Sequence, residues 1–209
     1  GFTIAESDGS TSVAETGTTD TFTVVLNAQP DSDVVLSITS SDIGEATVTS
    51  ALTFTSGNWN SAQTVTVTGV DDDLVDGTIT SIITVAVNDG SSDNNFDSVN
   101  DQTVSATTTD DDTAGFTIAE SGGSTSVNES GTTDTFTIVL NAQPAENVVF
   151  SIASSDTGEA NATTVNSPLT FTSANWDTAQ TVTVTGADDN LLDGTITSTL
   201  TISVVGSLS

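Results

Sequence analysis

Apolar residues alternate with hydroxyl residues through most of the chain, which is the period-two pattern of half-buried β-strands. The segment Thr64–Thr68 reads Thr-Val-Thr-Val-Thr, so its valines are expected inward and its threonines outward. Asn, Pro, Asp, Gly and Ser separate such segments, as turns require, and no stretch keeps a helical period over three turns. In the first half we predict strands at Phe2–Ala5, Thr11–Ala14, Thr21–Leu26, Asp33–Thr39, Ala46–Thr49, Leu52–Thr55, Thr64–Thr68, Thr78–Asn88 and Thr103–Thr108.

The pattern occurs twice. Gly1–Ser7 returns as Gly115–Ser121 and Thr18–Pro30 returns as Thr132–Pro144, both shifted by 114 positions, and after Glu159 the shift becomes 117. This period is too long for a solenoid repeat and has the size of a β-sandwich domain. We therefore predict an all-β fold of two tandem antiparallel sandwiches, residues 1–112 and 113–209.

The second copy lacks a counterpart of the last strand. Thr195–Val204 match Thr78–Val87, but nothing after them matches Gln102–Asp112. A sandwich without that strand exposes the backbone groups of a sheet edge beside an open groove. Two explanations stay open: the natural chain continues, or a strand from a neighbouring subunit fills the gap, with Gly1–Ser7 as a candidate donor.

The composition is extreme: 29 acidic residues, no Lys, Arg or His, and a net charge of −29. Repulsion on this scale opposes compaction, so the acids are expected to bind divalent cations, to suit a high-salt environment, or to keep a surface protein soluble. Nucleic acid is excluded as a partner because no side chain can neutralise phosphate. Without His, Cys, Lys, Arg or Tyr the usual catalytic pairs cannot form, and we expect no enzyme.

The chain shows no apolar run of membrane-spanning length, so no membrane insertion is expected. Gly1 opens directly on a strand pattern, which indicates a mature product or a piece of something longer. The two sequons at Asn128 and Asn161 are candidate glycosylation sites or chance matches. Trp59 and Trp176, in the frames LTFTSGNW and LTFTSANW, are predicted to close one end of each core, with carbohydrate stacking as the alternative.

Aspartates concentrate in two segments of the first copy, Asp71–Asp76 and Asp110–Asp112. Like charges this close repel unless a cation lies among them, and hard divalent ions take six to eight oxygen ligands. The second copy keeps Asp188, Asp189 and Asp193. The spacing is not that of an EF-hand, and solvated turns are the alternative interpretation.

The frame LTFTxxNW, then QTVTVTGxDDD, then an acidic triplet, resembles Calx-β and related immunoglobulin-like repeats of bacterial surface proteins, adhesins and sodium–calcium exchangers. The resemblance covers most of both copies and implies Ca²⁺ at one end of each sandwich. One departure is Leu74-Val75-Asp76-Gly77, where the family often carries several Glu, and it leaves the number of ions open. The implied ligands are Glu15, Asp42, Asp71, Asp72, Asp73, Asp76, Asp110, Asp111 and Asp112, with Glu129, Asp156, Asp188, Asp189 and Asp193 in the second copy.

These observations predict an extracellular or cell-surface module, stiffened by calcium at the joint between its repeats. It would serve as an extender in an adhesin, matrix protein or filament, with neighbouring copies of the same repeat or subunit as partners. Two alternatives stay open. One is a subunit of a self-assembling fibre or surface layer, completed by a donor strand. The other is a module that binds glycan or ice through outward threonines such as Thr64, Thr66 and Thr68.

Overall fold

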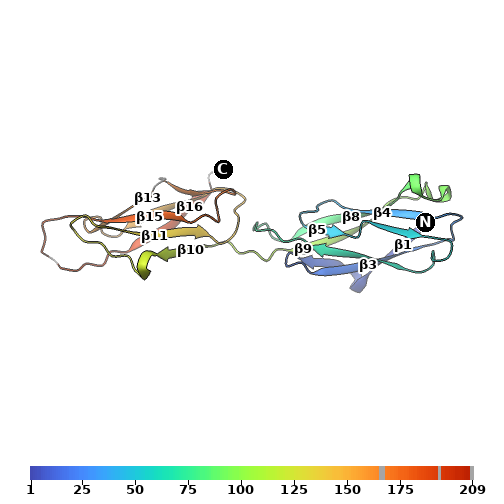
Figure 1. Cartoon of the computed structure of the whole chain (residues 1–209), viewed down its shortest axis with the longest axis horizontal. Helices are drawn as coiled ribbons and strands as arrows, with labels where there is room; N and C mark the ends of the chain where they lie inside the picture. The colour runs from blue at the N-terminus through green and yellow to red at the C-terminus, as the bar shows by residue number, and fades with distance from the viewer. Residues whose placement is uncertain (165–167, 193, 208–209) are drawn as a thin grey trace. The chain divides into compact units, whose positions relative to one another are not determined.

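The chain is all-β and forms two compact units, one of residues 1–72 and 76–111 and one of residues 73–75 and 112–209. The computed structural model describes residues 1–164, 168–192 and 194–207. Each unit is an immunoglobulin-like sandwich of two packed β-sheets (Figure 1). The strands of the first unit are β1 (Phe2–Glu6), β2 (Thr11–Ala14), β3 (Thr19–Leu26), β4 (Val34–Ser40), β5 (Ala46–Val48), β6 (Ala51–Phe54), β7 (Gln63–Gly69), β8 (Ile79–Val87) and β9 (Gln102–Thr109).

In the first unit, one sheet has the order β1-β3-β7-β5 and the other the order β2-β9-β8-β4-β6. The predicted alternation is confirmed in β7, where Val65 and Val67 are fully buried. They pack with Phe22, Phe54 and the other inward side chains of both sheets. Trp59 is partly buried against this core, as predicted.

One strand pair departs from the antiparallel arrangement that we predicted. β2 pairs with β9 in parallel, in the register Thr11↔Ala106 to Ala14↔Thr109. β2 crosses to the second sheet after β1 has paired with β3, and it reaches β9 running in the same direction. The last strand is therefore held on both sides, by β2 and by β8.

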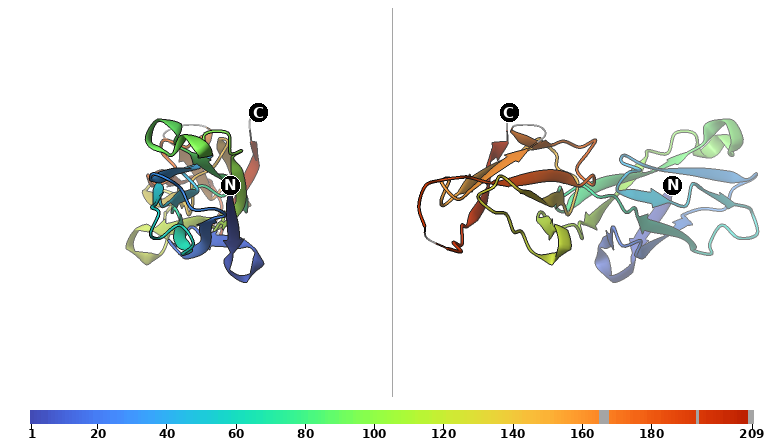
Figure 2. Two further views of the ribbon diagram at one scale, coloured as in Figure 1. Left: turned by 90° about the vertical axis from the view of Figure 1, so that its right-hand side faces the viewer. Right: turned by 60° about the vertical axis from the view of Figure 1, so that its left-hand side comes forward.

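Short 3₁₀ turns, which the sequence did not indicate, fill the connection between β8 and β9. They are η2 (Asp89–Ser91) and η3 (Asn94–Phe96), and Phe96 is buried in the core. Figure 2 shows them in green at the end of the unit where the N-terminus lies. Gln102 donates a hydrogen bond to the carbonyl of Phe2 at this end (2.8 Å).

The second unit repeats the first sheet as β10-β11-β15-β13, but its other sheet has only the order β14-β12-β16 among the described residues. Its core gathers around Phe136, Phe150 and Phe171, with Trp176 packed against it. As predicted, no strand corresponding to β9 follows β16 among the residues that the structure describes. The strands are β10 (Phe116–Glu120), β11 (Thr133–Leu140), β12 (Val148–Ser154), β13 (Ala160–Thr164), β14 (Leu169–Phe171), β15 (Gln180–Gly186) and β16 (Leu200–Ser207), with the 3₁₀ turns η1 (Ser7–Gly9) and η4 (Ser121–Gly123) in the first and second units.

Candidate cation site

Three loops at one end of the first sandwich bring Glu15, Glu45 and Asp76 together. Glu15 directly follows β2, and its N–H continues the parallel ladder by donating to the carbonyl of Thr109 (3.1 Å). Glu45 directly precedes β5, and its carbonyl accepts from the N–H of Val70 (2.9 Å) and the hydroxyl of Thr108 (3.2 Å). Asp76 lies in the loop between β7 and β8. The sheets thus fix the backbones of Glu15 and Glu45, while Asp76 extends from the loop between β7 and β8.

One carboxylate oxygen from each of these three residues lies within 4.8 Å of the others. Glu15 is 1% exposed and Glu45 is 6% exposed. Both Glu15 oxygens and one Glu45 oxygen have no partner with hydrogen-bond geometry among the described residues. A buried carboxylate without partners is costly, and the chain has no Lys, Arg or His to pair with it.

The spacing of these oxygens suits a calcium ion. Ca²⁺ binds oxygens at about 2.3 to 2.6 Å, so two ligands of one ion lie at most about 5 Å apart. The three carboxylates meet that condition, and acidic oxygen ligands are the type that Ca²⁺ prefers. Residues Glu15, Glu45 and Asp76 therefore fit a hard divalent cation.

The pKa values of the cluster reflect its charge. Burial raises the pKa of Glu15 to about 7, helped by the charges of Asp110 and Asp72 and opposed by the backbone N–H of Asp111. Burial, and then the charge of Asp76, raise the pKa of Glu45. Asp76 is exposed as a residue, and partial desolvation of its carboxylate, followed by the charges of Asp72 and Asp110, raises its pKa. The raised pKa values mean that each of these carboxyl groups ionises less readily than usual, and a bound cation would lower the pKa values and favour ionisation.

Asp110, just after β9, organises the loop that carries Asp76. Its Oδ2 accepts from the N–H of Asp76 (3.1 Å) and the N–H of Gly77 (2.7 Å). Gly77 has φ +79°, a conformation in which a side chain is strained. The end of the last strand therefore helps to shape the acidic loop.

A carboxylate oxygen of Asp110 also lies within 4.8 Å of one of Glu15, and the other candidate ligands of the first copy lie outside the group of Glu15, Glu45 and Asp76. Asp71 and Asp73 are exposed and lie outside the group of three. The Asp42 carboxylate accepts from the N–H of Gly44 within its own turn (3.0 Å). Asp72 and Asp111 act on the cluster by charge and by a backbone N–H, respectively. Asp112 is half-buried and opens the long segment of the second unit.

Glu45 was not among our candidate ligands, although a signal for it exists in the sequence. The segment SDIGEA at Ser41–Ala46 returns as SDTGEA at Ser155–Ala160. The resemblance selects Asp42 in this segment as the ligand, whereas the structure places a carboxylate oxygen of Glu45 in the cluster. A Glu kept in both copies directly before a buried Ala is the feature that would have indicated it.

In the second unit, Glu129 and Glu159 correspond to Glu15 and Glu45, and both are only half-buried. Asp188 is exposed, and Asp189 accepts from the N–H of Leu191 (2.6 Å). Asp156 caps its own turn as Asp42 does, accepting from Gly158 (3.0 Å). Asp193 lies outside the described residues.

The two sequon asparagines are exposed in the second unit. Asn128 accepts from the N–H of Ser130 (3.1 Å), and the amide of Asn161 donates to the carbonyl of Thr157 (2.9 Å). Glycosylation at either position stays a prediction.

Other acids serve the fold. Asp93 accepts from the N–H groups of Asp31 (2.6 Å), Ser32 (3.1 Å) and Asn95 (2.9 Å), and these bonds lower its pKa. Asp20 and Asp134 hold the equivalent turns of the two units, accepting from Ser12 and Ser126 (both 2.8 Å). Asp20, Asp93 and Asp134 are thus carboxylates that accept backbone hydrogen bonds and hold turns of the fold.

No known protein-family model matches the chain, and no curated protein sequence matches it. Among solved structures, the chain is similar to CBD12 from CALX1.2 (TM-score 0.36, 14% identity, 96% of this chain and 79% of that one). It is also similar to the calcium binding domain CBD12 of CALX1.1 (TM-score 0.38, 16% identity, 90% of this chain and 76% of that one). A third similar structure is domains 4 and 5 of the S-layer protein SbsC (TM-score 0.35, 15% identity, 98% of this chain and 92% of that one). Identities and TM-scores this low assign no function. Within the described part of the chain, no helix is long and apolar enough to span a bilayer.

Proposed function

We propose that this chain is an extracellular structural module of a surface adhesin, matrix protein or filament, and that its first unit binds Ca²⁺ through Glu15, Glu45 and Asp76. The observation that carries the proposal is a pair of buried glutamates, each with one oxygen within 4.8 Å of an Asp76 oxygen. Both Glu15 oxygens and one Glu45 oxygen lack a partner with full hydrogen-bond geometry in the part of the chain that the structure describes. A divalent cation supplies the missing positive charge. Its role here is structural, because it ties together three loops that otherwise repel one another.

The ion would also act on the segment that leads into the second repeat. Asp110 and Asp111 follow β9 directly and contribute to the electrostatics of Glu15. A cation held by Glu15 would therefore stabilise the start of the connector and reduce its freedom. This agrees with an extender that works in a calcium-containing, extracellular environment, with neighbouring copies as partners.

The test is thermal unfolding of residues 1–209 in EDTA, in Ca²⁺ and in Mg²⁺ at matched ionic strength. A ligand that binds only the folded state adds about 2.7 kcal/mol at a hundredfold excess over its dissociation constant. We expect a calcium-selective rise in the Tm of the first unit. Glu15→Gln should remove this rise, and should itself raise the Tm in EDTA because it removes a buried acid that lacks partners.

Glu146→Gln is the matched control, since Glu146 is exposed and outside the cluster. It removes the same charge and should keep the full response to calcium. An equal response to Ca²⁺, Mg²⁺ and plain salt would contradict the proposal and leave the acids as a solvated surface.

A second candidate function rests on the outer face of the β3–β7 pair. Thr19, Thr21 and Thr23 lie opposite Thr68, Thr66 and Thr64, and the second unit repeats this array in β11 and β15. Cross-strand neighbours lie about 5 Å apart and alternate residues of a strand about 6.8 Å apart. Such a lattice of methyl and hydroxyl groups suits a repeating ligand, either glycan or ice.

Retention of the chain by ice and by polysaccharide resins tests this candidate. Thr21→Lys with Thr66→Lys should abolish retention, whereas Thr80→Lys, exposed on the other sheet, should keep it. Retention that survives the double substitution would remove the array as the binding surface.

A further inference from the structure

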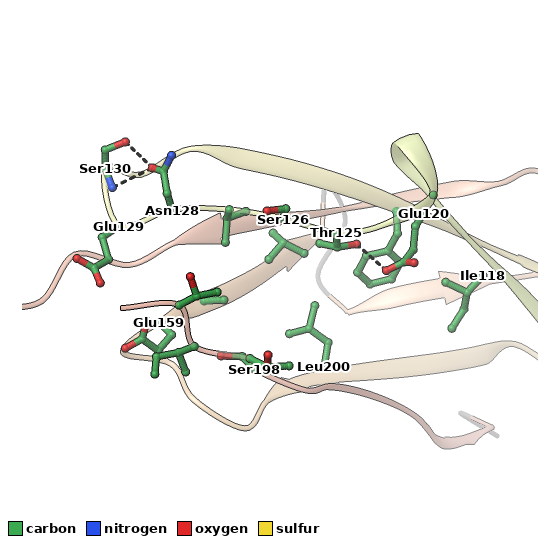
Figure 3. Close-up of a pocket in the computed structure, with 18 of the residues that line it drawn as sticks. Ile118, Glu120, Thr125, Ser126, Asn128, Glu129, Ser130, Glu159, Ser198 and Leu200 are labelled. Atoms are coloured by element: carbon green, nitrogen blue, oxygen red, sulfur yellow. Dashed lines mark hydrogen bonds between the residues drawn. The ribbon is translucent and has the colours of Figure 1, made fainter. Parts of the chain in front are cut away.

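The second unit contains a groove of about 1100 Å³ where the first unit has β9. Val127, Phe136, Val184 and Leu200 line its apolar part, and Glu129 and Glu159 line it as well. Figure 3 shows Thr125, Ser126 and Asn128 on one wall, Ser198 and Leu200 on the other, and the two glutamates together at one end.

The pairing in the first unit explains which parts of the second are incomplete. Residues 79–82 of β8 pair with β9 alone, while β4 pairs with β8 from Ile83 onward. β16 begins at Leu200, the counterpart of Ile83, and the preceding residues 196–199 form no strand. Residues 125–128, the counterpart of β2, also form no strand. In the first unit, β9 is the strand that pairs with both of the corresponding segments, so both segments of the second unit lack their pairing partner.

One wall of the groove is nevertheless already in position. Ser12 and Ala14 donate their N–H groups to Asp20 (2.8 Å) and Thr18 (2.7 Å), away from β9. Ser126 and Asn128 make the same bonds to Asp134 and Thr132 (both 2.8 Å). Successive N–H groups of a β-strand point to opposite sides, so the N–H groups between these donors point toward the position of β9. In the first unit the N–H of Glu15 donates to the carbonyl of Thr109 in β9.

At the acidic end of the groove, Gly194 has φ +80°, as its counterpart Gly77 has +79°. This glycine therefore keeps the backbone conformation that Gly77 has where its N–H donates to Asp110 in the first unit. Apolar side chains outside the groove lining are also more exposed in the second unit. Phe116 is 37% exposed where Phe2 is 3% exposed, and Val204 at the sheet edge is 55% exposed.

We propose that this groove binds an extended strand of the β9 type, with small apolar or Thr residues at three alternate inward positions followed by aspartates, and that Ca²⁺ strengthens its binding. In β9 the inward residues are Val104, Ala106 and Thr108, all buried. Docked in the same register, the aspartates arrive beside Glu129 and Glu159. The calcium dependence rests on the cation site proposed for the first unit, whereas the strand binding does not.

Charge makes the two events interdependent. An acidic strand meets three glutamates of the groove, Glu120, Glu129 and Glu159, and repulsion weakens its binding without a cation. With a cation among the carboxylates the repulsion becomes attraction, and by linkage the strand raises calcium affinity by the same factor.

The experiment titrates the whole chain into a labelled peptide of residues 101–112 (DQTVSATTTDDD) and follows fluorescence anisotropy at about 0.15 M salt, where exposed charges beyond about 8 Å are screened. We expect saturable binding that is about tenfold tighter in Ca²⁺ than in EDTA, within the usual range of coupled sites. Hydrogen exchange should slow at residues 125–129 and 196–199.

Peptide variants keep the protein constant and avoid changes in its folding. Ala106→Asp, at an inward position, should abolish binding, whereas Ser105→Asp, at an outward position, should keep it. Replacing the three terminal aspartates with Asn should remove the calcium advantage.

Absence of saturable binding, or equal binding of both single variants, would overturn the strand site. Equal affinity in Ca²⁺ and EDTA would overturn the coupling alone. Self-association of the chain without peptide, with the same exchange protection, would identify a second copy as the occupant and overturn the assignment to a β9-type strand. None of these outcomes decides the cation site of the first unit, which the thermal unfolding of Glu15→Gln tests separately.

Discussion

A Cβ atom on Gly69 would lie 2.0 Å from the carbonyl oxygen of Ala14, because the end of β7 packs backbone against backbone on the residue before Glu15. The second unit repeats this contact between Gly186 and Asn128, also at 2.0 Å. No real Cβ tolerates such a distance, and both partners are main chain, so neither can rotate away. The contact holds the start of the Glu15 turn against the sheet.

Gly69→Ala should therefore destabilise the first unit by about 1 to 3 kcal/mol or more, the typical cost of overpacking that forces the backbone to shift. Urea unfolding followed by tryptophan fluorescence measures this. Gly57→Ala is the control, because the nearest atom to its Cβ is a side-chain oxygen at 3.8 Å. Equal stability of the two variants would mean that β7 and the turn can separate without cost.

The stability of the metal-free protein should depend on pH with an unusual sign. The folded-state pKa of Glu15 is raised from 4.5 to about 7, so between these values the native state binds more protons than the unfolded state. Stability then falls as pH rises through this window, and the raised pKa values of Glu45 and Asp76 act in the same direction.

Calorimetric Tm values from pH 4.5 to 8 in EDTA test this dependence. Glu15→Gln should flatten the curve, and saturating Ca²⁺ should flatten it as well. A wild-type curve that rises with pH in EDTA would contradict the burial of an ionisable cluster. Calcium binding near pH 6 should also release protons, measurable as a buffer-dependent heat.

Glu45→Gln should weaken calcium binding more than Asp42→Asn does. Glu45 offers an oxygen to the cluster, whereas the Asp42 carboxylate is engaged by the N–H of Gly44. We expect a loss of about tenfold or more for Glu45→Gln, the effect of about 1.4 kcal/mol of lost interaction. Isothermal titration at pH 7.5 gives both affinities, and the opposite ranking would restore Asp42 as the ligand.

Asp93→Ala should destabilise the first unit without changing its affinity for calcium. The substitution removes a buried carboxylate that accepts from three partly buried backbone N–H groups, and hydrogen bonds to charged groups contribute more to stability than those between neutral groups. Asp89→Ala, at an exposed position in η2, is the control. Because the folded-state pKa of Asp93 is lowered, its contribution is present above pH 3.8 and is lost as pH falls through the lower folded value. A calcium affinity altered by Asp93→Ala would place this acid in the cation site.

Alternation predicted the inward side of β7 because the burial of Val65 and Val67 can be inferred from the threonines next to them in the sequence. The duplication predicted the two sandwiches and the absent strand because both can be read by aligning one copy of the sequence with the other. The parallel pairing of Thr11 with Ala106 could not be read in this way, because it joins segments far apart in the chain and depends on where β2 crosses between sheets. Asp93 and Asp110 look alike in sequence, and only their three-dimensional neighbours separate an acid that holds a loop from one beside a cation site.

The pairing of β2 with β9 has a mechanical consequence. In the sequence, β2 lies near the beginning of the first repeat and β9 near its end. In the structure they are neighbours, paired in parallel over the four pairs from Thr11↔Ala106 to Ala14↔Thr109. Tension applied to the two ends of the repeat acts along both strands, so it loads their hydrogen bonds together in shear rather than opening them one at a time. The second repeat has no such clamp within its described residues. Under load we therefore expect the first repeat to resist extension at forces that already unravel the second, and a strand docked in the groove to remove that difference.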